Sequence, residues 1–250
     1  MNPDRPQVAR RAPGFGIDPS LDGRALAPVF RRCSRLHLPG FLREPGATAL
    51  AAALSEAKGW TISTMGGDST IDIPVRAFAS ADQTARTALL ASAHHEARSG
   101  FHYLFESLRI SDLVEAGKPI PAPLAALYGW LNSDAFLSFA RDISGDPTLG
   151  YVDAQATRYL PGHYLNEHDD EKAGAGRRLA YVLNLSPAWR ASWGGLLAFL
   201  DADGHVAEAY TPAFNALNLF RVPQPHMVSQ VTAFAGAPRL SITGWIRVGR

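Results

Sequence analysis

The sequence predicts an α+β fold in which a mainly helical first half supports a β-rich second half. Between residues 44 and 143 the chain has alanine- and leucine-rich stretches, whereas from 151 to 248 it has eight short runs separated by turn residues. Eight short strands in roughly 100 residues are typical of a sandwich or barrel. Gly145-Asp146-Pro147 breaks the chain between the halves, and no long linker follows it. We therefore expect a single domain over residues 31–250.

Residues 1–30 are expected to form a tail, and residues 31–148 the helical support. The first residues are rich in arginine and proline and have no apolar stretch, so they do not resemble a secretory signal. A short strand is expected within 31–42. Alanine-rich segments with leucines four residues apart predict helices, and the expected helices span 44–58, 81–98, 122–131 and 133–143.

The segment 149–250 is expected to be the β-rich core. Short runs with strand character alternate there with glycine, proline and aspartate turns, which is the pattern of consecutive antiparallel strands. The expected strands span about 151–160, 165–169, 178–185, 195–200, 205–210, 216–221, 226–232 and 239–248.

Composition and charge argue against several classes of protein. The 250 residues are 46% hydrophobic, which allows a sizeable core. The formal net charge is +1, so the overall charge gives no reason to expect nucleic-acid or membrane contact. No apolar run approaches the roughly 18 residues of a membrane span. The one cysteine, Cys33, allows no internal disulfide. This suits a reducing cytoplasm, where we expect the protein to reside.

One stretch, ending in His168-x-Asp170, has the residue types of a metal site. In an extended chain, residues two apart point to the same face, so the imidazole and the carboxylate can reach one point in space. Fe(II) accepts this mixture of nitrogen and oxygen ligands. His226, 58 residues later (226 − 168), is the candidate for a second imidazole. His163 and His205 compete for the role, although His205 follows a turn whose carboxylates are usually solvated.

The last run of the chain, 239–248, predicts a strand with two different faces. Even-numbered positions are apolar or glycine, whereas Arg239 shares its face with Ser241, Thr243 and Trp245. A buried guanidinium is costly unless it meets an anion. Its partner is either a carboxylate of the protein or an acidic ligand held by two parallel hydrogen bonds.

In this order and at these distances, the motifs resemble the 2-oxoglutarate- and Fe(II)-dependent dioxygenases, specifically their prolyl-hydroxylase-like branch. The resemblance extends from about residue 151 to 248 and includes a Gly-Gly strand at 193–199. A lone His-x-Asp is common by chance, but His-x-Asp, Gly-Gly, His and Arg-x-Ser-x-Thr-x-Trp in succession are specific. The resemblance implies a double-stranded β-helix, or jelly roll, with the metal at its open end and helices covering one sheet.

The resemblance also implies roles for individual residues. It gives His168, Asp170 and His226 as metal ligands, and Arg239 as the residue that grips the distal carboxylate of 2-oxoglutarate. The other residues that it implies to contact 2-oxoglutarate are Tyr159, Tyr181 and Thr243.

The implied reaction hydroxylates an unactivated C–H bond with O2 and 2-oxoglutarate, and releases succinate and CO2. Fe(II) and L-ascorbate are the implied cofactors. Asp170 favours hydroxylation, because halogenating members have a small residue at the carboxylate position.

The implied substrate is a prolyl residue of a protein or peptide. A small-molecule or free amino-acid hydroxylase, a non-iron metalloprotein such as a zinc hydrolase, and a silent interaction module stay open. The role of segment 61–78 also stays open between a cover over the substrate and an ordinary hairpin.

Overall fold

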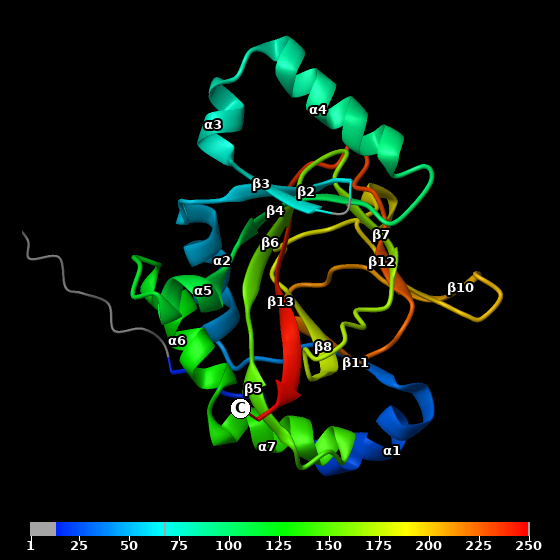
Figure 1. The fold of residues 1–250 in the computed structure, drawn as a ribbon. Helices are drawn as coiled ribbons and strands as arrows, with labels where there is room; N and C mark the ends of the chain where they lie inside the picture. Colours follow the sequence, from blue (N-terminus) through cyan, green and yellow to red (C-terminus); the bar gives the residue numbers. More distant parts are fainter. Residues whose placement is uncertain (1–13, 68, 250) are drawn as a thin grey trace, which may run out of the picture.

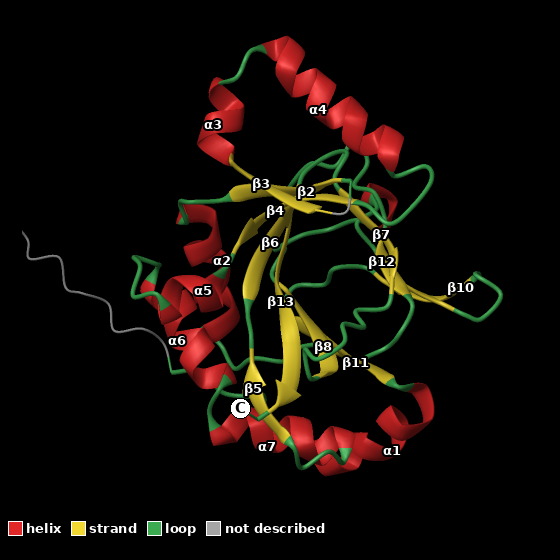
Figure 2. Ribbon diagram, in the orientation of Figure 1, coloured by secondary structure: helices red, strands yellow, loops and turns green. Residues whose placement is uncertain are grey.

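A computed structural model describes residues 14–67 and 69–249 of the chain. One large curved sheet forms the centre, and helices lie along one side of it (Figures 1 and 2). The expected α+β class is confirmed. The strands are β1 Arg35–Leu38, β2 Thr61–Gly66, β3 Ser69–Pro74, β4 Tyr103–Leu108, β5 Leu149–Val152, β6 Gln155–Tyr159, β7 Tyr164–His168, β8 Arg177–Asn184, β9 Leu197–Leu200, β10 Val206–Tyr210, β11 Ala216–Arg221, β12 His226–Val228 and β13 Arg239–Val248.

The sheet is antiparallel and almost closes on itself. Its strand order is β1-β11-β8-β13-β6-β4-β7-β12-β9-β10, with β2 and β3 added to β4, and β5 added to β13. Strand β4 pairs with β6 at one end and β7 at the other, so it joins the two layers of the jelly roll. The outermost strands β1 and β10 meet through the ion pair Arg35–Glu208 and through the stacked rings of His37 and Tyr210, 4.6 Å apart. The expected jelly-roll core is confirmed.

Helices cover the outer face of the layer that contains β8 and β13. Leucines, isoleucines and aromatic rings of these helices pack against the same face of β6, β8, β11 and β13 and form the largest apolar core of the described residues. The helices that cover this face are α1 Gly23–Cys33, α2 Gly46–Glu56, α5 Ile110–Glu115, α6 Ala122–Leu131 and α7 Asp134–Ser144. Two further helices, α3 Val75–Ser80 and α4 Gln83–Glu96, lie apart from them, beyond the β2–β3 hairpin. A single turn of 3-10 helix spans Ala191–Trp193.

The expectation of a tail over residues 1–30 is wrong from residue 23 onward. Residues 1–13 lie outside the described part of the chain, but helix α1 begins at Gly23, capped by the Asp22 side chain, which accepts a hydrogen bond from the backbone N–H of Arg24. Pro28 in the middle of the segment concealed its helical spacing, because proline is a helix breaker in most contexts. The ring of Phe30 is 0% exposed and belongs to the main core. The wider single-domain organisation stays a prediction.

Replacing Phe30 by alanine should lower the free energy of unfolding by about 3–5 kcal/mol, because it removes a fully buried ring and leaves a cavity. Chemical denaturation of the purified protein measures this change. The neighbouring Val29 is 39% exposed, so Val29→Ala should cost only about 0.5 kcal/mol. Equal, small effects of the two substitutions would contradict the packing of α1 into the core.

Segment 61–78, left open between a substrate cover and an ordinary hairpin, contains the hairpin of β2 and β3, paired from Thr61 opposite Pro74 to Gly66 opposite Ser69. Strand β2 extends the sheet through β4, and β3 is the outer strand. Ser63, Met65 and Thr70 of this hairpin border a cavity of about 710 Å³. Among the same residues, no helix is both long and apolar enough to cross a membrane.

Candidate metal centre

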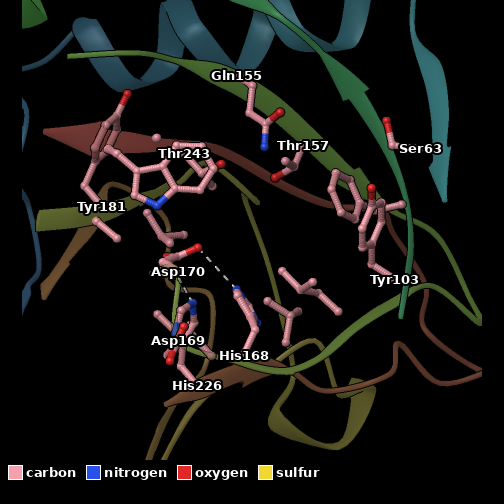
Figure 3. Close-up of a pocket in the computed structure, with 18 of the residues that line it drawn as sticks. Ser63, Tyr103, Gln155, Thr157, His168, Asp169, Asp170, Tyr181, His226 and Thr243 are labelled. Atoms are coloured by element: carbon pink, nitrogen blue, oxygen red, sulfur yellow. Dashed lines mark ion pairs between the residues drawn. The ribbon is translucent and has the colours of Figure 1, made fainter. Parts of the chain in front are cut away.

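The pairing of two short strands brings two imidazoles together. His168 is the last residue of β7, His226 is the first of β12, and the two are opposite each other in the antiparallel register. Asp170 follows two residues after His168 in a left-handed conformation, with φ at 66°, which turns its carboxylate back toward both rings (Figure 3). Its oxygens lie 3.5 Å from Nε2 of His168 and 3.5 Å from Nε2 of His226. One ligand atom from each of the three residues falls within 4.8 Å of the others.

Backbone carbonyls fix which nitrogen of each ring faces the centre. Nδ1 of His168 lies 2.9 Å from the carbonyl oxygen of Asn166, and Nδ1 of His226 lies 2.7 Å from that of Gln224. A carbonyl oxygen only accepts, so each Nδ1 carries the hydrogen and donates it. Each Nε2 is thereby left with a free lone pair, which is the orientation that metal-binding histidines usually have.

The local electrostatics favour the protonation states that bind metals. Burial alone would raise the pKa of Asp170, but the neighbouring imidazoles of His168 and His226 lower it below its ordinary value. Burial, helped by the adjacent His168, lowers the pKa of His226 to about 4. Asp170 is therefore a carboxylate and His226 a neutral imidazole at neutral pH, the states in which these side chains bind metals. Two nitrogens and one oxygen on one side of an open cavity fit Fe(II).

Arg239, at the start of β13, is the second unusual feature of the same cavity. Its side chain is 1% exposed, and its guanidinium donates to the hydroxyl of Ser241 at 3.1 Å and lies over the ring of Tyr159 at 5.1 Å. Its Nε has no hydrogen-bond partner, and no carboxylate of the described residues forms an ion pair with it. Burial lowers the pKa of this guanidinium, although arginine stays charged at any ordinary pH. A buried, unpaired cation beside a metal centre is a site for an anionic ligand.

Two consecutive glycines allow close packing here, Gly195 against Arg239 and Gly194 against a neighbouring backbone carbonyl. Gly194 and Gly195 both have positive φ, at 69° and 62°. A Cβ at Gly195 would lie 3.0 Å from Cδ of Arg239, and one at Gly194 would lie 2.0 Å from the carbonyl oxygen of Gln230. The Gly-Gly motif of the sequence is thus needed both for backbone conformation and for close packing.

The expected cofactor contacts divide into two groups. Tyr159 and Thr243 border the cavity of about 710 Å³ that also contains the three metal-ligand candidates and Arg239. Tyr181 borders it too, but its hydroxyl donates to the carbonyl oxygen of Asp153 at 2.9 Å, and its ring packs in the core beneath the helices. The expected contact of the Tyr181 hydroxyl with 2-oxoglutarate is therefore wrong, because residues 179, 181 and 183 face the helices. Val182 occupies the cavity side of β8.

The competing histidines lie outside the cluster of candidate ligands. His163 is buried, and this burial lowers its pKa to about 4. His205 belongs to an exposed turn in which Asp201 accepts a hydrogen bond from its backbone N–H. Asp169, next to Asp170, is exposed and accepts a hydrogen bond from the backbone of Glu171.

Arg177 contacts Trp245 and the backbone of Asp170, which the sequence alone did not predict. Its guanidinium lies 3.4 Å from the ring centre of Trp245 and donates to the backbone carbonyl of Asp170 at 2.9 Å. It therefore holds the segment that carries the carboxylate. The arrangement depends on the pairing of β8 with β13, where Arg177 is opposite Arg247, and a register of this kind has no signal in a single sequence.

Comparison with known proteins agrees with this geometry. Residues 154–247 match the model of the 2OG-Fe(II) oxygenase superfamily. This segment is less than half of the chain, contains all the candidate site residues and is similar to that superfamily. The chain is 36% identical over 118 residues to the mouse prolyl 3-hydroxylase OGFOD1, and 37% identical over 101 residues to that of Xenopus laevis. These matches include 44% and 38% of the chain, but only 21% and 19% of the relatives. The chain thus spans about a fifth of the curated relatives that it matches.

Solved structures share the fold of this protein over most of its length. A prolyl-4-hydroxylase from Pseudomonas putida aligns with a TM-score of 0.56 and 20% identity, covering 91% of this protein and 99% of that chain. A prolyl hydroxylase from Trichoplax adhaerens, in complex with a peptide fragment of the hypoxia inducible factor oxygen degradation domain, aligns with a TM-score of 0.59 and 16% identity, covering 90% and 89%. At such identities the likeness extends to the fold alone.

Proposed function

We propose that this protein is an Fe(II)- and 2-oxoglutarate-dependent dioxygenase that hydroxylates a prolyl residue of a protein or peptide. The observation that carries the proposal is the presence, in one cavity, of a His-Asp-His cluster and a buried arginine that pairs with no carboxylate of the described residues. The names of its relatives, prolyl 3-hydroxylase and prolyl-4-hydroxylase, support the choice of substrate.

In this proposal His168, Asp170 and His226 hold Fe(II) through Nε2, a carboxylate oxygen and Nε2. Arg239 binds the distal carboxylate of 2-oxoglutarate, and Tyr159 and Thr243 border the same ligand. When bound, iron and 2-oxoglutarate supply the oxidising chemistry: one oxygen atom of O2 enters succinate as 2-oxoglutarate loses CO2, and the other enters the substrate C–H bond. The task of the protein is to orient these groups and to exclude water from them.

Individual residues carry out that orientation. The carbonyls of Asn166 and Gln224 hold the two rings so that their Nε2 atoms face one point. Arg177 holds the backbone at Asp170 by a hydrogen bond. Apolar side chains of β8, β9 and β11 form part of the wall of the cavity that contains Arg239. Such a wall strengthens the attraction between the guanidinium and a carboxylate, because water is excluded from their contact.

Turnover of 2-oxoglutarate tests this function. The protein is purified without O2, supplied with Fe(II) and ascorbate, and the conversion of 2-oxoglutarate to succinate is followed under air, with and without a pool of proline-containing peptides. We expect succinate that requires Fe(II) and increases with the peptides. Omission of ascorbate from the assay tests its expected role as a cofactor. Residence in the cytoplasm is also part of the proposal. No succinate and no binding of 2-oxoglutarate would contradict the assignment.

A further inference from the structure

Three aromatic residues line one wall of the cavity from its mouth to its base. Phe101 lies two residues before β4, and Tyr103 and Phe105 follow on the same side of the strand, because every second residue of a strand faces the same way. Their ring centres are 5.8 Å and 5.4 Å apart. Phe105 in turn stacks on Tyr159 at 5.2 Å. We call Phe101, Tyr103 and Phe105 the β4 aromatic row.

The outer end of this row lies beside the candidate metal ligands and is open to solvent. Phe101 is 47% exposed, and its ring centre is 5.5 Å from that of His168. The hydroxyl of Tyr103 forms a hydrogen bond of 2.8 Å with Thr70 of the β2–β3 hairpin, which fixes its ring toward the cavity (Figure 3). Large apolar side chains left exposed at the edge of a cavity mark a surface that a ligand covers.

The opening of the cavity continues beyond the space that one amino acid needs. A second hollow of about 340 Å³ adjoins the first, and the two share Arg109, Gln155, Arg177 and Trp245 as lining residues. The second hollow is lined by polar groups, including the ion pair of Arg247 with Asp153. The cavity that contains Phe101 and the candidate metal ligands therefore adjoins a polar hollow at Arg177 and Trp245.

We propose that the β4 aromatic row is the surface that takes the ring of the target residue, and that the substrate is an extended polypeptide whose neighbouring residues occupy the second hollow. This inference rests on the proposed function and specifies its substrate class. Aromatic surfaces bind prolyl segments well, because the ring of proline is rigid and apolar and the extended chain loses little entropy on binding. A free amino acid would leave the second hollow without a ligand.

Binding to an array of peptides of about twelve residues, each with one central proline, tests the inference; extended segments of this kind are a common recognition mode. Fe(II) and 2-oxoglutarate are present and O2 is absent, so binding is measured without turnover. The best peptide is then titrated by fluorescence anisotropy, with free L-proline as competitor. We expect wild type to bind peptides and free L-proline to compete poorly.

Phe101→Ala should weaken peptide binding about tenfold, which corresponds to the loss of one aromatic contact, and should leave the Kd for 2-oxoglutarate unchanged. Tyr103→Phe keeps the ring and should change peptide affinity less than Tyr103→Leu. Phe234→Ala is the matched control, since Phe234 is 68% exposed and is not among the residues that line either hollow. Its peptide affinity should equal that of wild type.

Wild-type peptide affinity in Phe101→Ala, or competition by free L-proline as strong as that by the peptide, would overturn the inference. Binding of 2-oxoglutarate without binding of any peptide would also overturn it, while leaving the proposed oxygenase chemistry intact. Failure of the wild-type protein to bind 2-oxoglutarate would instead remove the proposed function, and the inference with it.

Discussion

Replacing His226 by alanine should abolish Fe(II) binding and, with it, all conversion of 2-oxoglutarate. The side chain supplies one of only three protein ligands in the cluster, and its Nε2 is held in place by the hydrogen bond of Nδ1 to Gln224. A two-ligand remnant of His168 and Asp170 loses most of the affinity for a metal, which depends on ligand number and geometry.

Metal analysis and thermal denaturation measure this effect independently of activity. A ligand that binds only the folded protein stabilises it by about 2.7 kcal/mol at a concentration of 100 times its Kd. Added Fe(II) should therefore raise the Tm of the wild-type protein but not that of His226→Ala. His205→Ala is the matched control, because His205 lies outside the cluster, and it should respond to Fe(II) as wild type does. An undiminished response of His226→Ala would show that the metal binds elsewhere.

Most strands of the second half could be predicted closely, because each is short and bounded by turn residues. The expected strand 151–160 is instead two strands, β5 and β6, and the expected strand 226–232 ends at Val228. The two faces of the last strand were also correctly predicted: Leu240, Ile242 and Ile246 pack in the core, whereas Arg239 and Thr243 border the cavity. Alternation along that strand is visible in the sequence, since one of its faces carries polar side chains.

The orientation of Tyr181 could not be predicted in the same way. From Leu179 to Asn184 every residue of β8 is buried, because helices cover one face of the strand and the cavity wall covers the other. A strand buried on both faces has no polar alternation to reveal its orientation. Only the pairing of Tyr181 with Gly244, which places it on the face opposite Thr243, settles the question.

The metal cluster was predictable in composition but not in geometry. The spacing His-x-Asp indicated that His168 and Asp170 meet, yet the structure brings them together through a left-handed turn at Asp170 rather than a regular strand. Likewise, the opposition of His168 and His226 follows from the register of β7 with β12. Sequence separation alone does not specify such a register.

Replacing Arg239 by methionine should weaken 2-oxoglutarate binding strongly while leaving Fe(II) binding intact. Loss of one partner of a buried, hydrogen-bonded charge pair costs about 2–5 kcal/mol, or roughly 30-fold to several thousand-fold in Kd. Calorimetric titration of 2-oxoglutarate into the Fe(II)-loaded protein without O2 measures this change. Unchanged affinity in Arg239→Met would show that the carboxylate is bound by another group.

The same substitution should have the opposite effect on the stability of the ligand-free protein. Arg239 is buried, and among the described residues its Nε has no partner and its guanidinium has a side-chain hydrogen bond with Ser241 alone. Replacing such a charge by an apolar side chain of similar length should raise the free energy of unfolding, by about 1–4 kcal/mol. Arg158 is the contrasting case, because it pairs with the buried carboxylate of Glu106.

Arg158→Met should therefore lower the free energy of unfolding, by about 3–5 kcal/mol, since it leaves a buried carboxylate unpaired, and it should not change the affinity for 2-oxoglutarate. Opposite signs of the two stability changes, measured by chemical denaturation without ligand, would distinguish a cation kept for an external anion from one kept for the fold. If Arg239→Met instead destabilised the protein as Arg158→Met does, the guanidinium would have a structural partner, and the argument for an anion site would fail. A stabilised variant that no longer binds 2-oxoglutarate is the combination that only a ligand-binding arginine explains.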